Sequence, residues 1–353
     1  MKSLVKTSKN VGFELIDRKS PVPKKDEVLL KVKVATICGS DLHLWEWNSW
    51  ANNFVSKIPL GVGHETCGEI VDHGPEANLE NFNLKIGDIV SVETHLFCGQ
   101  CKSCKNNKKH LCSLGRILGF HKDGSFSEWV TVPVQNCWKA REGTHPITVS
   151  LKEPLGNAVQ TVMAQPIKGK DVLITGAGPL GLMTIAAARA FDARSIFVSE
   201  LQKERRDKAV ELGADYVIDP RKEDLHSIIE EKTKGEMFDV LLEISGSNEA
   251  LNQGLKSIAH GGDVALLGLF AGHIKIPVNE NIVFKGLSMK GITGRLIWET
   301  WEQVDELIYK KGFDPKNLIT HSFTIKEHEE AFKLMEKGVS GKIALFPNEI
   351  LDD

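Results

Sequence analysis

The spacing of hydrophobic and polar residues divides the chain into two parts with different periodicities. In the first ~150 residues, hydrophobic side chains recur at every second position, as in Glu27–Val34, where Leu30, Val32 and Val34 fall on one side. A period of two, interrupted by prolines and glycines, is typical of short strands with one buried face. Further strands are expected at Asp88–Val92 and Phe126–Val132.

Between Gly169 and about Gly294 the pattern changes to short apolar runs that alternate with longer amphipathic or Ala-rich segments. Such alternation predicts a parallel sheet wrapped by helices. After about Trp298 the chain returns to a helix and ends in an apolar strand, Lys342–Phe346, which we expect to pack on the first part. The expected strands are Asp171–Thr175, Ser195–Ser199, Val240–Ile244 and Val264–Leu269, and the expected helices are Leu180–Phe191 and Lys203–Leu212.

Composition narrows the class of protein. A chain of 353 residues with 41% hydrophobic residues is long enough for about two domains with separate cores. The net charge of -3 and the lack of a basic stripe argue against nucleic acid as a partner. The first ten residues lack the apolar segment of a signal peptide, and no run reaches the roughly 18 apolar residues of a membrane helix. We therefore expect a cytoplasmic protein, with no membrane partner.

Four of the seven cysteines form one cluster with the spacing C-x2-C-x2-C-x7-C. Four thiolates are a complete ligand set for a structural Zn2+, which leaves no open position for catalysis. The residues between them are mostly lysine, asparagine and glycine and cannot build an apolar core, so a metal is needed to order the loop. An iron–sulfur cluster and disulfides are the alternatives. The cysteines are Cys98, Cys101, Cys104 and Cys112.

A G-x-G-x-x-G sequence follows the expected strand Asp171–Thr175 and opens a helix, which is the context of a dinucleotide-binding turn. Free N–H groups at the helix start would hold the cofactor's phosphates. Glu200 ends the next strand, where it can accept both ribose hydroxyls and repel a 2′-phosphate, which favours NAD over NADP. Arg205 and Arg206 lie nearby and could instead hold such a phosphate. The expected cofactor-binding residues are Gly176, Gly178, Leu180, Gly181, Glu200 and Arg205.

Three other segments of the β-rich part carry residues that could bind a second metal. They contain Cys38, His64 with Glu65, and Glu153. Mixed thiolate, imidazole and carboxylate ligation with an open position is typical of catalytic zinc. Taken singly, a cysteine is usually a small buried residue and a histidine a satisfied polar group, and spacing alone cannot unite three distant segments.

Together, these motifs resemble the zinc-dependent medium-chain dehydrogenases over essentially the whole chain. The resemblance rests on Cys38-Gly-Ser-Asp-Leu-His43, Gly63-His-Glu65, the four-cysteine lobe and the glycine turn. It implies an α/β protein with a GroES-like β-barrel catalytic domain and a Rossmann domain, a doubly wound parallel sheet. The catalytic domain would comprise residues 1–155 and 297–353, with the zinc lobe at 95–115, and the Rossmann domain residues 156–296.

The resemblance also assigns roles. It implies NAD and two zinc ions per subunit, one structural and one catalytic, in a homotetramer. The catalytic ion would be held by Cys38, His64 and Glu65, with Glu153 as a fourth or alternating ligand. Ser40 and His43 would relay the hydroxyl proton to solvent.

Within the family, the Trp-rich stretch Gly291–Trp301 matches the branch that oxidises the C3 hydroxyl of L-threonine to 2-amino-3-oxobutanoate. In that branch His95 and Arg295 would bind the polar groups of the substrate. A polyol or vicinal diol is the alternative substrate, and a zinc-stabilised binding protein without catalysis is the alternative class. The chain departs from the family pattern at Cys67, expected to be buried, and at His121, Cys137, Gln160 and Gln165.

Overall fold

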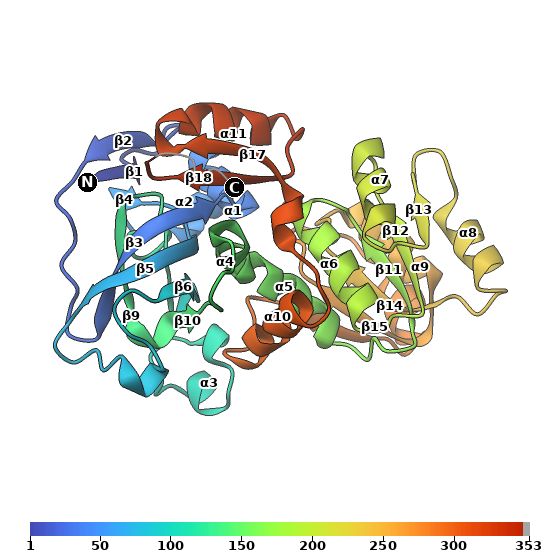
Figure 1. Ribbon diagram of the computed structural model, residues 1–353. Coiled ribbons are helices and arrows are strands. Elements are labelled where there is room, and N and C mark those ends of the chain that lie inside the picture. Colours follow the sequence, from blue (N-terminus) through green and yellow to red (C-terminus); the bar gives the residue numbers. More distant parts are fainter. Residues whose placement is uncertain (349–353) are drawn as a thin grey trace. The chain divides into compact units, whose positions relative to one another are not determined.

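The computed structural model describes residues 1–348 and divides into two compact units (Figure 1). Unit 1 comprises Met1–Pro154 and the segment from Asp314 onward, and unit 2 comprises Leu155–Phe313. The second boundary therefore lies after Phe313 rather than after residue 296, where the sequence analysis placed it. The difference is the segment 297–313, which hydrogen-bonds within unit 2 because Thr300 Oγ1 donates to Gln160 Oε1 at 2.7 Å.

Unit 1 is built on two main sheets, to which the short pair β7–β8 is added. A small sheet has the order β2-β1-β4, and a larger, mostly antiparallel sheet has the order β10-β6-β5-β3-β18-β17, with β9 also paired to β3. The strands are β1 (Lys2–Lys6), β2 (Glu14–Asp17), β3 (Glu27–Thr36), β4 (Leu60–Gly61), β5 (Glu65–His73), β6 (Ile89–Val92), β9 (Trp129–Pro133), β10 (Cys137–Lys139), β17 (Ile319–Thr324) and β18 (Lys342–Phe346).

The core of unit 1 follows from the period of two in β3. Leu30, Val32 and Val34 are buried, whereas Lys31 is exposed, as their alternation predicts. β18 pairs with β3, so the prediction that the last strand packs on the first part of the chain is confirmed. The helices of this unit are α1 (Gly39–Glu46), α2 (Ser49–Phe54), α3 (Lys102–Lys105), α4 (Pro146–Ser150) and α11 (His328–Glu336), and a two-stranded sheet joins β7 (His95–Leu96) to β8 (Arg116–Ile117).

Unit 2 is a six-stranded parallel sheet with the order β13-β12-β11-β14-β15-β16, wrapped by helices (Figure 1). This order reverses beside β11, which is the topology of the predicted doubly wound fold. The strands are β11 (Asp171–Thr175), β12 (Ser195–Ser199), β13 (Tyr216–Ile218), β14 (Phe238–Glu243), β15 (Ile258–Leu266) and β16 (Ser288–Gly291), and the helices are α5 (Lys152–Met163), whose first residues belong to unit 1, α6 (Pro179–Ala190), α7 (Lys203–Glu211), α8 (Leu225–Lys232), α9 (Asn248–Ser257) and α10 (Glu299–Tyr309).

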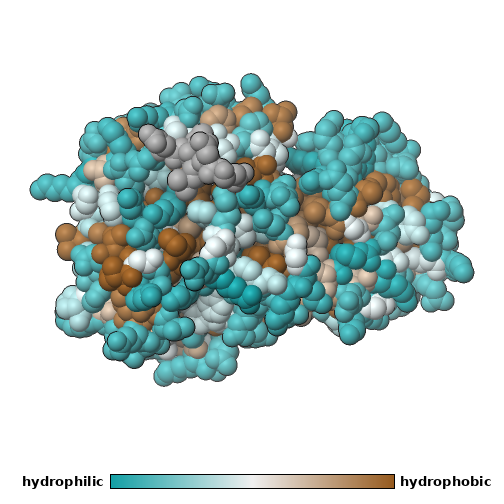
Figure 2. All heavy atoms as spheres, in the orientation of Figure 1, coloured by the Kyte–Doolittle hydropathy of each residue, from teal (hydrophilic) through white to brown (hydrophobic). Residues whose placement is uncertain are grey.

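The central strand of unit 2, β11, is buried along its whole length. All five residues of β11 are buried, as expected of a parallel strand covered by helices on both faces. Hydrophilic side chains cover most of the surface that is visible in Figure 2. Within residues 1–348, no helix is long and apolar enough to cross a membrane.

Candidate functional site

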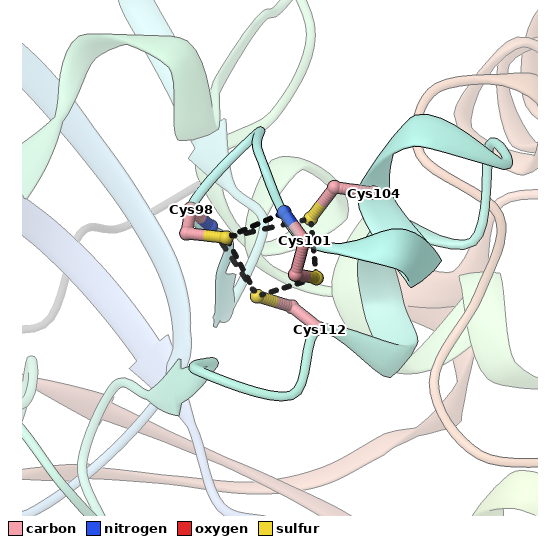
Figure 3. A group of neighbouring side chains, drawn as sticks. All are labelled: Cys98, Cys101, Cys104 and Cys112. Atoms are coloured by element: carbon pink, nitrogen blue, oxygen red, sulfur yellow. Dashed lines mark hydrogen bonds between the residues drawn. The ribbon is translucent and has the colours of Figure 1, made fainter.

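The four clustered cysteines converge in the lobe between β7 and β8 (Figure 3). Their sulfur atoms are separated by 3.5 Å for Cys101–Cys104 and Cys98–Cys112, 3.8 Å for Cys101–Cys112 and 4.0 Å for Cys98–Cys104. Tetrahedral zinc with Zn–S bonds of about 2.3 Å separates its sulfur ligands by about 3.8 Å. All seven cysteines are free thiols, so the disulfide alternative is wrong. The lobe therefore fits a closed tetrahedral metal site.

Backbone donors in the lobe favour thiolates. The N–H groups of Gln100 and Cys101 both point at Cys98 Sγ, at 3.4 Å. Hydrogen bonds from the backbone of Cys104 and Ser113 lower the pKa of Cys101 to about 5. Burial raises the pKa of Cys104 to about 12, so in the absence of a cation this thiol would stay protonated. A bound cation would complete the ionisation that the backbone has begun.

A second cluster joins Cys38, His64 and Glu65, whose ligand atoms all lie within 4.8 Å of one another. Cys38 follows β3 as the N-cap of α1, while His64 and Glu65 lie at the start of β5. Because β3 and β5 are neighbouring antiparallel strands, the end of one meets the start of the other. The sheet therefore brings together ligand residues that are distant in sequence.

His64 is oriented by a buried carboxylate. Its Nδ1 lies 3.3 Å from Asp41 Oδ1, which leaves Nε2 as the nitrogen for a metal. Asp41 Oδ2 also accepts a hydrogen bond from the Cys38 N–H, at 2.9 Å. Burial alone would lower the pKa of His64, but Asp41 and Cys38 raise it well above its usual value. The cluster thus carries enough negative charge to attract a proton, and it fits a cation.

Glu65 makes its closest contacts with a lysine from the other end of the chain. Both carboxylate oxygens lie 2.5 Å from Lys342 Nζ, and Oε2 also accepts a hydrogen bond from Thr36 Oγ1. Glu65 is fully buried, and Lys342 is 5% exposed. Burial acts to lower the pKa of Lys342, but Glu65 and Cys38 reverse the shift, so the lysine stays charged.

Glu153, the expected fourth or alternating ligand, is buried at the start of α5. Its Oε1 accepts a hydrogen bond from Thr94 Oγ1 at 3.0 Å. The carboxylate is close enough to Glu65 to help raise its pKa, after the larger effect of burial. Glu153 therefore lies beside the cluster without belonging to the compact set of three donors.

The two expected relay residues lie one turn apart on α1. Ser40 and His43 are both half-buried. Asn48 Nδ2 lies 2.6 Å from His43 Nδ1 and donates to it, so the neutral ring carries its proton on Nε2. The position of α1 is fixed by Cys38 at its start, which links the relay to the metal cluster.

The two expected substrate-binding residues lie in different units. His95 begins β7 in unit 1, and its Nδ1 is 2.7 Å from Glu93 Oε1. Arg295 belongs to unit 2 and is fully buried, with its guanidinium carbon 5.8 Å from the centre of the Trp301 ring. A Cβ on Gly156 would come within 2.5 Å of the Arg295 side chain, so this glycine makes room for the arginine.

The glycine turn has the geometry that its sequence predicts. Gly176 has a φ of 85°, which favours glycine. A Cβ on Gly181 would come within 2.1 Å of Gly176 O, so only glycine lets α6 approach the strand this closely. Gly178 caps α6 and leaves the first N–H groups of the helix available for an anion. Leu180, in the first turn of α6, is half-buried.

Glu200 is buried behind this turn rather than exposed beside it. Its Oε2 accepts a hydrogen bond from the Ala177 N–H at 2.7 Å, and its Oε1 accepts one from Gln202 N–H at 2.8 Å. Arg206 donates to the carbonyl oxygens of Glu200 and Leu201 and lies 3.3 Å from Asp219. The guanidinium of Arg206 therefore interacts with other residues of the protein and has a structural role.

The side chain of Arg205 extends toward the glycine turn instead. Its Nη1 lies 3.8 Å from where a Cβ of Gly178 would stand. Of the two arginines, Arg205 is thus the one that reaches the glycine turn. This arrangement separates a structural arginine from a candidate ligand-binding one, a distinction that the sequence Glu-Arg-Arg alone does not make.

The residues that depart from the family pattern have structural roles. Cys67 lies fully buried in β5 and confirms the prediction of a small buried residue; burial raises its pKa, like that of Cys137, to about 12. His121 Nδ1 accepts from the Ile117 N–H, and its Nε2 donates to Phe54 O. Gln160 and Gln165 both bond within unit 2.

Sequence reasoning missed three residues around the metal cluster. Asp41 stands inside the quoted Cys38–His43 motif, so its buried position in the first turn of a helix could have been suspected. Thr36 ends β3, just past the expected strand Glu27–Val34 and shortly before Cys38. The only sign of Lys342 in the sequence is a lysine at the start of an otherwise apolar strand. Its partner could not be predicted, because the contact with Glu65 joins residues 277 positions apart.

Comparison with known proteins agrees with this geometry. Residues 24–142 match the model of an alcohol dehydrogenase GroES-like domain, and residues 179–310 match that of a zinc-binding dehydrogenase. L-threonine 3-dehydrogenase of Thermococcus kodakarensis is 45% identical over 99% of both chains, and that of Pyrococcus furiosus is 45% identical over 97% of both. The crystal structure of 2R,3R-butanediol dehydrogenase from Bacillus subtilis superposes with a TM-score of 0.88 at 29% identity, covering 98% of this chain and 99% of that one.

Proposed function

Because the chain belongs to the zinc-binding dehydrogenases, and within them to the L-threonine 3-dehydrogenase family, we propose that it oxidises the C3 hydroxyl of L-threonine with NAD. The substrate loses a hydride to NAD+ and a proton to solvent, and the products are 2-amino-3-oxobutanoate, NADH and H+. The observation that carries the proposal is the convergent donor set of half-buried Cys38 with buried His64 and Glu65. A binding protein without catalysis would need no such donor set in addition to a closed structural site.

The residues of unit 1 prepare the hydroxyl chemistry. A zinc ion held by Cys38, His64 and Glu65 would supply a Lewis acid that makes a hydroxyl easier to deprotonate. Asp41 lies beside the ring of His64, and Glu153 supplies a second carboxylate near Glu65. Ser40 and His43 would carry the released proton outward, since a hydroxyl and an imidazole can each accept and donate one.

The residues of unit 2 would bind the dinucleotide. The N–H groups at the start of α6 and the guanidinium of Arg205 favour the pyrophosphate. Glu200 already accepts two backbone hydrogen bonds, and its remaining lone pairs could accept from the ribose hydroxyls. Its negative charge would repel a 2′-phosphate, which supports NAD as the cofactor.

The amino and carboxylate groups of threonine distinguish it from simple alcohols. We assign its polar end to His95, which Glu93 holds in place, and to Arg295. Two zinc ions per subunit, a homotetramer and a cytoplasmic location complete the proposal. The four-cysteine lobe would hold the structural ion.

A substrate panel tests the proposal. The protein is loaded with zinc, and NADH formation is measured with L-threonine, sorbitol and 2,3-butanediol, each with NAD or NADP. We expect kcat/KM to be highest for threonine with NAD. A higher value for either polyol or diol would move the protein to the alternative substrate class, and equal or better use of NADP would show that Arg205 outweighs Glu200.

A further inference from the structure

Lys342 is an unusual residue at the start of a buried strand. The other four residues of β18 are apolar and buried, whereas Lys342 places an ammonium group in the same interior. An ammonium has three N–H donors. Lys342 directs them at Glu65 Oε1, Glu65 Oε2 and Ile37 O, at 2.5, 2.5 and 2.8 Å. All three N–H donors of Lys342 are therefore used by residues just after β3 and at the start of β5.

The carboxylate of Glu65 is correspondingly occupied. A carboxylate offers about four lone-pair directions. Lys342 takes one on each oxygen, and Thr36 takes the second on Oε2. Thr36 and Glu65 are direct cross-strand partners, so the threonine cannot move away without disturbing the pairing of β3 and β5. One direction, on Oε1, remains for any further ligand.

The chain can bury a lysine without a carboxylate partner. Lys6 is also fully buried, and its Nζ donates to the carbonyl oxygens of Asn10, Gly12 and Trp45. Neutral carbonyl groups thus accommodate a lysine inside this unit, although burial lowers the pKa of Lys6 to about 8. Lys342 differs from Lys6 in that its partner is a carboxylate, and this carboxylate belongs to a candidate metal ligand.

We propose that Lys342 is a positioning residue of the Cys38–His64–Glu65 site, which restricts Glu65 to one oxygen for a metal and so preserves an open coordination position. The inference rests on the proposed function in that this site holds zinc. It also accounts for charge: thiolate and two carboxylates bring three negative charges near a divalent ion, and Lys342, which interacts electrostatically with Cys38, Glu65 and Glu153, balances the remaining one.

The test is the zinc affinity of this site in Lys342→Met, measured by chelator competition. The substitution removes a positive charge near the metal and frees both Glu65 oxygens, so we expect zinc to bind about tenfold more tightly or better. With cobalt in place of zinc, an added oxygen ligand should weaken the visible absorption bands, because five-coordinate cobalt absorbs less than tetrahedral cobalt. An unchanged or weaker affinity, with an unchanged spectrum, would overturn the proposal.

Matched variants separate positioning from a general electrostatic or structural effect. Lys342→Arg keeps the charge and two donors and should restore the affinity and spectrum of the original protein. In a Glu65→Gln background, Lys342→Met should lose its effect on the spectrum; an effect that persists would show that Lys342 does not act through Glu65. The four-cysteine lobe serves as an internal control, since its affinity should not change.

A smaller change keeps the test decisive if Lys342→Met fails to fold. Thr36→Val removes one donor from Glu65 Oε2 and should tighten zinc binding about two- to threefold, with the same direction of spectral change. No change in either quantity would contradict the restriction of Glu65. If the original protein binds no metal at this site, the proposed function itself falls, an outcome distinct from any result for Lys342.

Discussion

The two candidate metal-ligating clusters of unit 1 are assembled in opposite ways. The lobe takes all its donors from one segment, Cys98 to Cys112, with little hydrophobic packing around them. The Cys38–His64–Glu65 site draws its donors from the start of helix α1 and the start of strand β5, and a lysine 277 residues away holds one of them. A metal should therefore organise the lobe, whereas the sheet organises the second site. The first should depend on metal for stability and the second for activity.

The largest expected effect separates activity from stability at the second site. His64→Ala removes one donor, but the strands and Asp41 keep their places. We expect turnover with threonine to fall about a thousandfold or more, because no Lewis acid would be held there. The melting temperature should change little. NAD affinity, measured by fluorescence quenching, should stay close to normal, since the glycine turn lies in unit 2; retained turnover in a variant shown to lack this zinc would place the chemistry elsewhere.

The lobe should show the reverse. Cys101→Ser leaves three ligands around a charged loop, and we expect one zinc per subunit to be lost. The stability of the folded protein should fall by about 2–4 kcal/mol, or about 4–16 °C in Tm. Metal analysis and calorimetry measure the two quantities. A variant with full zinc content and an unchanged Tm would show that the loop is ordered without the metal.

The smallest effect concerns the reactivity of the thiols after metal removal. The pKa of Cys101 lies at about 5, so this residue should be alkylated quickly at pH 8 once a chelator has removed zinc. Cys67 and Cys137 have pKa values raised to about 12 by burial, so they should stay protonated and react slowly at the same pH. Mass spectrometry of labelled peptides distinguishes them. Rapid labelling of Cys67 would mean that metal removal opens β5, which would weaken the contrast between the two sites.

The same difference explains what the sequence could predict. The lobe and the glycine turn are local, and periodicity located β11, β12 and β18 with the observed bounds. β17 was missed because its sequence, ITHSFT, is mostly polar and half-buried. The segment around α10 groups with unit 2 by its contacts, and its attachment to Gln160 is a side-chain contact that no periodicity reveals. Lys342 escaped prediction for the same reason.

Glu200 has a consequence for attempts to change the cofactor by design. Because its carboxylate accepts a hydrogen bond from the Ala177 N–H, the residue proposed to discriminate against NADP also holds in place the turn proposed to bind pyrophosphate. Removing it outright would loosen both cofactors together and give a poor enzyme rather than a converted one. A successful conversion needs a neutral acceptor at this position, such as glutamine or serine, combined with the existing Arg205. In the proposed function, cofactor preference thus depends on the same side chain that holds the Ala177 N–H in place.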